Sequence, residues 1–154
     1  MNPARLFALS LVALLVGLAG CGSSPKTVTK AQYQAQLEKS GRAVTIAGQQ
    51  LGKVITIAEF NGAVTDLQKA LRDGEKNLKG LQPPANARAA NKRLAQAFGD
   101  LADALEAVKE ARRVSIVKAR QALGDLGKTD AIKEGRAAIE ELDRLGYSAS
   151  GAAP

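Results

Sequence analysis

Cys21 is the residue with the clearest covalent chemistry, because a thiol is a nucleophile and this is the only cysteine among 154 residues. A single cysteine cannot close a disulfide within the chain. It follows a short segment with one positive charge, Arg5, and a run over residues 6–17 that is apolar apart from Ser10. That run is as long as a secretory signal core and shorter than the ~20 residues of a membrane-spanning helix. The pattern predicts a secretory signal over residues 1–20.

The residues directly before the cysteine are small. The stretch Leu18-Ala19-Gly20-Cys21 resembles the lipobox of bacterial lipoproteins. The resemblance implies cleavage between Gly20 and Cys21, a diacylglycerol thioether on the Cys21 sulfur and acylation, with palmitate for example, of the new amino group. Two or three acyl chains anchor a protein stably, whereas one is marginal. It also implies attachment to the cell membrane on the extracytoplasmic side. In a cell that has an outer membrane, attachment to that membrane is the alternative.

Two other interpretations of this segment stay open. One is a simple secretory signal that leaves Cys21 as a free thiol. The other is a transmembrane anchor, against which the lack of a basic cluster directly after the apolar run argues. Residues 21–29 contain Gly, Ser, Pro and Lys and no apolar period. We expect them to form the lipidated cysteine and a short flexible tether.

The other residue types that support catalysis are missing or scattered. The chain has no histidine, which removes the commonest general base and metal ligand, so we expect no Ser-His-Asp triad, metal or cofactor. Carboxylates at helical spacing are the remaining candidates for cation binding or hydrolysis. They form two rows, Glu59, Asp66 and Asp73 in the first and Asp100, Asp103 and Glu106 in the second. We expect both rows to face solvent beside basic residues.

Basic residues outnumber acidic ones by 22 to 15, which gives a formal net charge of +7. The densest group surrounds Glu110 and comprises Lys109, Arg112, Arg113, Lys118 and Arg120. For an exported chain with few aromatics, anionic lipid or acidic envelope polymers are nearer partners than nucleic acid. Such attraction is screened beyond about 8 Å at physiological salt, so it needs a short tether. The alternative is a basic surface that only keeps the domain soluble.

Helices must position these residues, because apolar residues recur every three or four positions. Thr29 with Gln32 and Thr56 with Glu59 match capping boxes at helix starts, and Pro83-Pro84 ends the second helix. The expected inner faces comprise Tyr33, Leu37, Leu51, Phe60, Val64, Leu71, Leu78, Ala90, Leu94, Phe98, Leu105, Val108, Ile139 and Leu142.

The third helix begins after the proline pair, and its end is ambiguous. Arg112 and Arg113 interrupt the apolar stripe, so the helix either ends near Ser115 or continues to the turn-forming stretch 124–130. The continuous helix is favoured, because that stretch is the stronger local break. A last helix follows and stops at Gly146.

These elements predict an all-α fold, an antiparallel bundle of about four helices over residues 30–146. Residues 147–154 are Ser, Ala, Gly and Pro apart from Tyr147, and we expect a disordered tail there. Gly48 and Gly52 form a step at which another backbone could approach, and a loosely formed helix fits these glycines at least as well.

Three stretches, Thr29–Tyr33, Leu81–Pro84 and Glu141–Tyr147, resemble parts of small, uncharacterised helical lipoproteins of high-GC bacteria. The resemblance implies fold and location and brings no activity with it. We therefore expect a non-enzymatic binding or interaction module of the cell envelope, with a protein partner that the sequence does not identify. A carrier that holds a small ligand or lipid in an apolar slot between helices is the alternative. A hydrolase that uses the carboxylate rows is the third.

Overall fold

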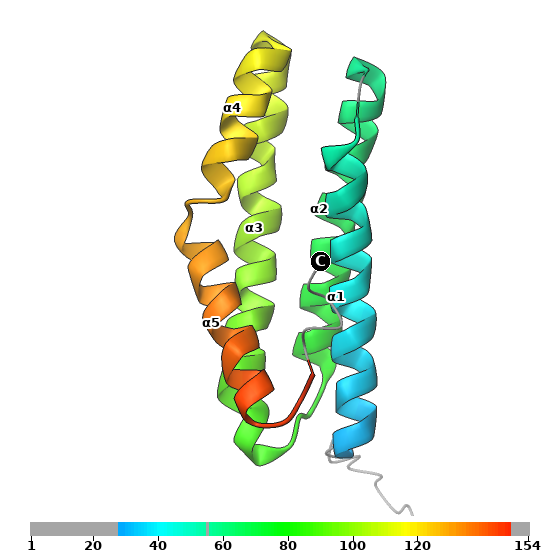
Figure 1. The fold of residues 1–154 in the computed structure, drawn as a ribbon, viewed down its shortest axis with the longest axis vertical. Helices are drawn as coiled ribbons and strands as arrows, with labels where there is room; N and C mark the ends of the chain where they lie inside the picture. The colour runs from blue at the N-terminus through cyan, green and yellow to red at the C-terminus, as the bar shows by residue number, and fades with distance from the viewer. Residues whose placement is uncertain (1–27, 55, 149–154) are drawn as a thin grey trace, which may run out of the picture.

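The computed structural model describes residues 28–54 and 56–148, and within these ranges the chain forms helices and no strand. The predicted all-α class is confirmed (Figure 1). The described elements are α1 (Lys30–Gly52), α2 (Ile57–Gly80), the short 3-10 helix η1 (Ala85–Ala87), α3 (Arg88–Val114), α4 (Ile116–Leu126) and α5 (Asp130–Arg144). The predicted signal, with Gly20 and Cys21, lies outside the described residues.

The starts of the first two helices follow from local hydrogen bonds. The Thr29 hydroxyl accepts from the Gln32 N–H at 3.2 Å, and the Gln32 side chain accepts from the Thr29 N–H at 3.0 Å. Thr56 and Glu59 exchange the same pair of bonds at 3.3 and 2.9 Å. Each box satisfies two N–H groups that a helix start leaves without intrahelical partners. Both predicted capping boxes are confirmed.

Consecutive helices pack side by side, α1 on α2 and α2 on α3, and α3 packs against both α4 and α5. Figure 1 shows α4 and α5 one after the other along α3. The name proximal end is used for the end of the molecule at which α1 begins, α5 ends, and the chain passes from α2 to α3. The distal end holds the α1–α2 and α3–α4 connections. At 1.5 Å per residue, the 27 residues of α3 separate the two ends by about 40 Å.

The core consists of leucines, alanines and a few aromatics on the inner face of each helix. Most predicted inner-face residues are buried, among them Tyr33, Leu37, Leu51, Phe60, Val64, Leu71, Leu78, Ala90, Leu94, Phe98, Leu105, Val108 and Leu142. Half-buried side chains such as Leu67, Leu101 and Ile139 pack around them. The helical periodicity therefore identified the faces that meet.

The favoured continuous third helix is wrong, and the break near Ser115 is correct. Ser115 is extended, with φ −165° and ψ 158°, and its hydroxyl accepts from the Lys118 N–H at 3.1 Å as the N-cap of α4. The chain reverses there, so that α4 returns along α3 and buries Ala119. A straight helix would have left that apolar face in solvent, and its burial offsets the cost of breaking the helix. Within the stretch 124–130, only residues 127–129 lie outside the helices, as the junction between α4 and α5.

Both predicted ends of the folded domain need adjustment. Tyr147, expected at the start of a disordered tail, is only 3% exposed. Gly146 adopts φ 77°, and the Tyr147 N–H donates to the Leu142 carbonyl at 2.9 Å, which closes a Schellman motif and turns the ring inward. At the other end, the Val28 N–H donates to the Gln82 carbonyl at 3.0 Å. Val28, expected in the tether, is therefore held against the bundle.

The close approach that Gly48 and Gly52 could permit does not occur within the described fold. A Cβ atom built on either glycine would meet nothing within 4 Å. The close contacts lie elsewhere, because a Cβ on Gly74 would sit 2.7 Å from the Phe98 ring. The missing side chain at Gly74 lets α2 accept this ring of α3, which is what a glycine in a packed helix interface provides.

Candidate interaction surface

The predicted basic group lies around the α3–α4 connection at the distal end. Lys109 donates to the Gln68 side chain and lies 3.3 Å from Glu106, so its charge is matched within the fold. Arg113 pairs with Glu110 at 3.1 Å. The other three members, Arg112, Lys118 and Arg120, have no ion pair among the described residues. Structure thus divides the group into two matched and three unmatched cations.

The basic group does not lie at the end of the molecule where a short tether would attach. The chain enters the fold at the proximal end, and the basic group lies about 40 Å away along α3. Charge attraction in physiological salt decays over about 8 Å. A tether at the proximal end therefore brings the group to a headgroup layer only if the long axis lies along that layer.

Exposed apolar side chains lie between these cations. Val114, the last residue of α3, is 69% exposed, and Val117 in the first turn of α4 is 71% exposed. Both flank the break at Ser115, where neither helix covers them. We name residues 112–120 the elbow. Sequence reasoning listed its cations but missed the valines, since a continuous helix would have made them ordinary surface positions.

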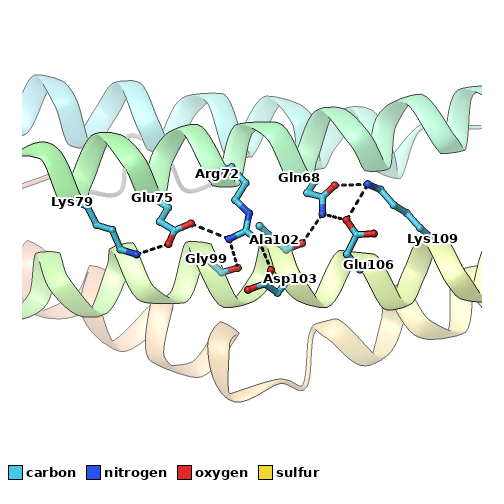
Figure 2. A network of polar contacts seen from close by, with 9 residues as sticks. All are labelled: Gln68, Arg72, Glu75, Lys79, Gly99, Ala102, Asp103, Glu106 and Lys109. Atoms are coloured by element: carbon cyan, nitrogen blue, oxygen red, sulfur yellow. Dashed lines mark hydrogen bonds and ion pairs between the residues drawn. The ribbon is translucent and has the colours of Figure 1, made fainter.

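A network of polar contacts joins α2 to α3 along their exposed seam (Figure 2). Arg72 of α2 donates to Glu75 at 3.1 Å, to the Gly99 carbonyl at 3.5 Å and to Asp103 of α3. Lys79 donates to Glu75 at 2.6 Å. The Lys79 hydrogen bond, followed by that of Arg72, lowers the pKa of the Glu75 carboxyl. The lowered pKa favours the carboxylate form of Glu75, which suits an ion pair in a structural bridge more than a proton acceptor.

A second part of the same seam lies toward the distal end. The Gln68 amide donates to the Ala102 carbonyl at 2.9 Å and to Glu106 (Figure 2). Hydrogen bonds from Gln68 and then from Lys109 lower the pKa of Glu106. The contacts with Gln68 and Glu106 hold the Lys109 ammonium at the seam, so its charge does not add to the unmatched charge of the elbow.

The predicted carboxylate rows face solvent and do not converge on an enclosed site. Glu59, Asp66, Asp100 and Asp103 are all exposed. No group of three or more carboxylates or other ligands that could hold a metal occurs among the described residues. Glu59 and Asp66 line one open groove of about 390 Å³ together with Lys53. The described structure therefore gives no support to a carboxylate-based hydrolase.

The interior offers little room for a ligand at the place where four helices meet. A void of about 20 Å³ lies there, lined by Leu37, Ser40, Phe98 and Ile139 among others. That volume suits at most one water molecule. The Ser40 hydroxyl lines it, is buried and has no partner among the described residues. A larger groove of about 380 Å³ lies on the surface between the end of α2 and the start of α3.

A buried polar cluster at the proximal end escaped the sequence analysis. The Tyr33 hydroxyl donates to the Asn91 side chain at 3.1 Å, and Asn91 donates to the Leu78 carbonyl at 3.0 Å. The Tyr33 and Tyr147 rings meet edge to face, with centroids 5.2 Å apart. Burial, with a smaller contribution from Tyr147, raises the pKa of Tyr33 far above its ordinary value of 10.0. The available signal was Asn91, a polar residue directly between the inner-face positions Ala90 and Leu94.

This cluster joins four parts of the chain. The Tyr147 hydroxyl donates to the Asn86 side chain at 2.9 Å, and the Lys30 ammonium lies 5.3 Å from the centre of the Tyr147 ring. Arg93 of α3 also forms an ion pair with Glu141 of α5 nearby. Every polar side chain of the cluster has a partner, as a structural lock requires.

None of the described helices combines the length and the hydropathy that crossing a bilayer requires. Searches against protein-family models, curated proteins and solved structures find no match to the chain. The function proposed for the protein therefore rests on its own residues. The elbow holds the two most exposed large apolar side chains of the described residues, beside cations without an ion pair among those residues.

Proposed function

We propose that the protein is a lipid-anchored, non-enzymatic interaction module of the cell envelope. Cleavage between Gly20 and Cys21 and lipidation of Cys21 would hold it on the extracytoplasmic side of a membrane. The folded part is proposed to act as an antiparallel bundle of four rows, in which α4 and α5 together form the fourth row. The all-helical fold supports this, because each helix buries one face against a neighbour.

The elbow is the single observation that supports an interaction role. Val114 and Val117 leave more than two-thirds of their side chains in solvent, beside cations that have no ion pair among the described residues, and such exposed apolar groups gain by being covered. The Tyr33–Asn91 cluster and the Arg72–Glu75 network have hydrogen-bond partners within the fold, so a structural role accounts for both. We assign no catalytic role to any described residue.

The anchor is tested by changing Cys21 to Ala and keeping the rest of the chain. We expect the native protein to enter the detergent phase, to incorporate labelled palmitate and to begin at a modified Cys21 by mass spectrometry. Cys21→Ala should lose the label and the cleavage at this position. Ser23→Ala, which keeps the cysteine, is the matched control and should behave as the native protein. A free Cys21 thiol in the membrane-bound protein would reject the proposal.

A carrier function is the second candidate, and the surface groove between α2 and α3 favours it over an internal slot. Half-buried Leu81 supplies apolar surface beside the buried Leu78 and Ala95, and Lys92 supplies positive charge, as does Lys79, which pairs with Glu75. These chemistries suit a small anionic amphiphile. Native mass spectrometry of the protein purified from its own cells should then show a retained ligand that Lys92→Glu loses. A protein that is always recovered empty would argue against the carrier.

A further inference from the structure

The elbow combines the two side-chain chemistries that a lipid surface takes up together. Val114 and Val117 are more than two-thirds exposed, on either side of the helix break. Arg112, Lys118 and Arg120 lie in the same nine residues without ion pairs among the described residues. Interfacial protein segments place apolar side chains at the level of the acyl boundary and cations among anionic headgroups.

Charge around the elbow favours an anionic surface. Residues 106–120 contain five cations and two carboxylates. Both carboxylates are matched inside the fold, Glu106 by Gln68 and Lys109 and Glu110 by Arg113. The unmatched charge that remains is therefore positive, and it is concentrated beside the exposed valines.

We propose that the elbow is a second membrane contact, which lays the protein along an anionic lipid surface with its proximal end and its elbow about 40 Å apart. This rests on the proposed anchor. From Cys21 to Val28 the chain can extend at most about 25 Å, which leaves the proximal end free to tilt. A lipid bilayer fits the elbow better than an acidic polymer does, because a polymer offers no apolar layer for two valines.

The test uses the lipidated full chain in vesicles and a fluorophore near the elbow. Gln121 is exposed and lies one helical turn from Val117 on the same face, so Gln121→Cys carries the label without altering the elbow. Gln49→Cys on α1 is the control, because α1 lies on the opposite side of the molecule from α4. Lipids that carry a quencher report whether each label touches the bilayer.

In phosphatidylglycerol–phosphatidylcholine vesicles, we expect the label at position 121 to be quenched and the label at position 49 to stay in water. In pure phosphatidylcholine, neither should be quenched. Val114→Ser with Val117→Ser, and separately Lys118→Glu with Arg120→Glu, should each reduce the quenched fraction about tenfold. Ile46→Ser, at an exposed apolar position on α1, should leave it unchanged.

The outcomes separate this inference from the anchor. A chain that floats with both kinds of vesicle while position 121 stays in water would disprove the elbow contact alone. A chain that floats with neither would reject the anchor and the second contact together. If only the charge reversals matter and the serine variants bind normally, the elbow binds an acidic polymer or headgroup by charge, and the proposed membrane contact is wrong. Concentration-dependent association without vesicles would instead indicate a second copy as the partner and would also reject it.

Discussion

The proximal and distal ends of the molecule differ in how closely they are packed and in which side chains they leave exposed. Two glycines of the proximal half touch their neighbours, since a Cβ on Gly74 would meet Phe98 and one on Gly135 would meet Ala97 at 3.4 Å, although Gly80 at the end of α2 meets nothing within 4 Å. Distal glycines such as Gly62 have nothing within 4 Å. The proximal end also buries two tyrosines whose hydroxyls both have hydrogen-bond partners, whereas the distal end exposes Val114, Val117 and Ile57.

This difference suggests that the two ends of the helical fold contribute differently to stability. A close-packed end with buried hydrogen bonds resists opening, because every displaced group loses contacts or a partner. An end with exposed apolar and unmatched charged side chains gains free energy only from something outside the fold. Stability and interaction are therefore expected to depend on different residues, and substitutions can separate the two.

The largest effect is expected from Tyr33→Ala at the proximal end. The substitution removes a fully buried aromatic ring and leaves Asn91 without its donor, and we expect a loss of about 3–5 kcal/mol in the free energy of unfolding. Ile57→Ala at the distal end should cost less than about 1 kcal/mol, because Ile57 is 52% exposed. Urea unfolding measures both. Similar losses at the two ends would remove the contrast between them.

Gly74→Ala and Gly62→Ala, both within α2, compare the two ends with one chemical change. A methyl group on Gly74 collides with the buried Phe98 ring, so we expect a loss of about 1–3 kcal/mol. The same change at Gly62 meets open space and should stabilise α2 by up to about 1 kcal/mol, through helix propensity alone. Thermal unfolding should move the two melting temperatures in opposite directions. A gain at Gly74 would show that the helices are not in close contact there.

Tyr33→Phe sharpens the comparison through pH. We expect a loss of about 1–2 kcal/mol near neutral pH, because the Asn91 side chain loses its donor. The raised pKa of Tyr33 means that its contribution is fully present below about pH 10 and is lost as pH rises, since the unfolded chain releases the proton near 10.0.

The free energy of unfolding of the native protein should therefore fall above pH 10 relative to that of Tyr33→Phe, by up to about 1.4 kcal/mol per pH unit. Urea titrations of both proteins across this range measure the difference. The lysines common to both chains cancel in the comparison. Parallel pH profiles would mean that burial does not raise the pKa of Tyr33.

Much of the fold could be predicted because its causes are local. The capping boxes at Thr29 and Thr56 involve residues three positions apart, and Pro83-Pro84 ends a helix without reference to any neighbour. The inner faces follow from helical spacing, since residues three or four apart share a face in every α-helix. The amino-terminal signal and Cys21 depend likewise on a short linear pattern, and they stay predictions with their own tests.

The break at Ser115 could not be decided locally. Arg112 and Arg113 permit an ending and Ser115 permits a cap, but residues 116–126 can also continue the helical period. The choice depends on how much apolar surface α4 buries by returning along α3, which is a property of two segments together. The same break exposes Val114 and Val117, so the candidate site was hidden from sequence reasoning for the same reason.

The sequence by itself determined where helices start, which faces they bury and that residues 109–120 are basic. Each of these depends on side chains within about one or two helical turns of one another. Only the tertiary structure decided that Lys109 is matched by Gln68 of α2, that Tyr147 packs on Tyr33 and that the basic group lies far from where the chain enters. Those outcomes join residues tens of positions apart, and their free energies exist only once the helices have packed.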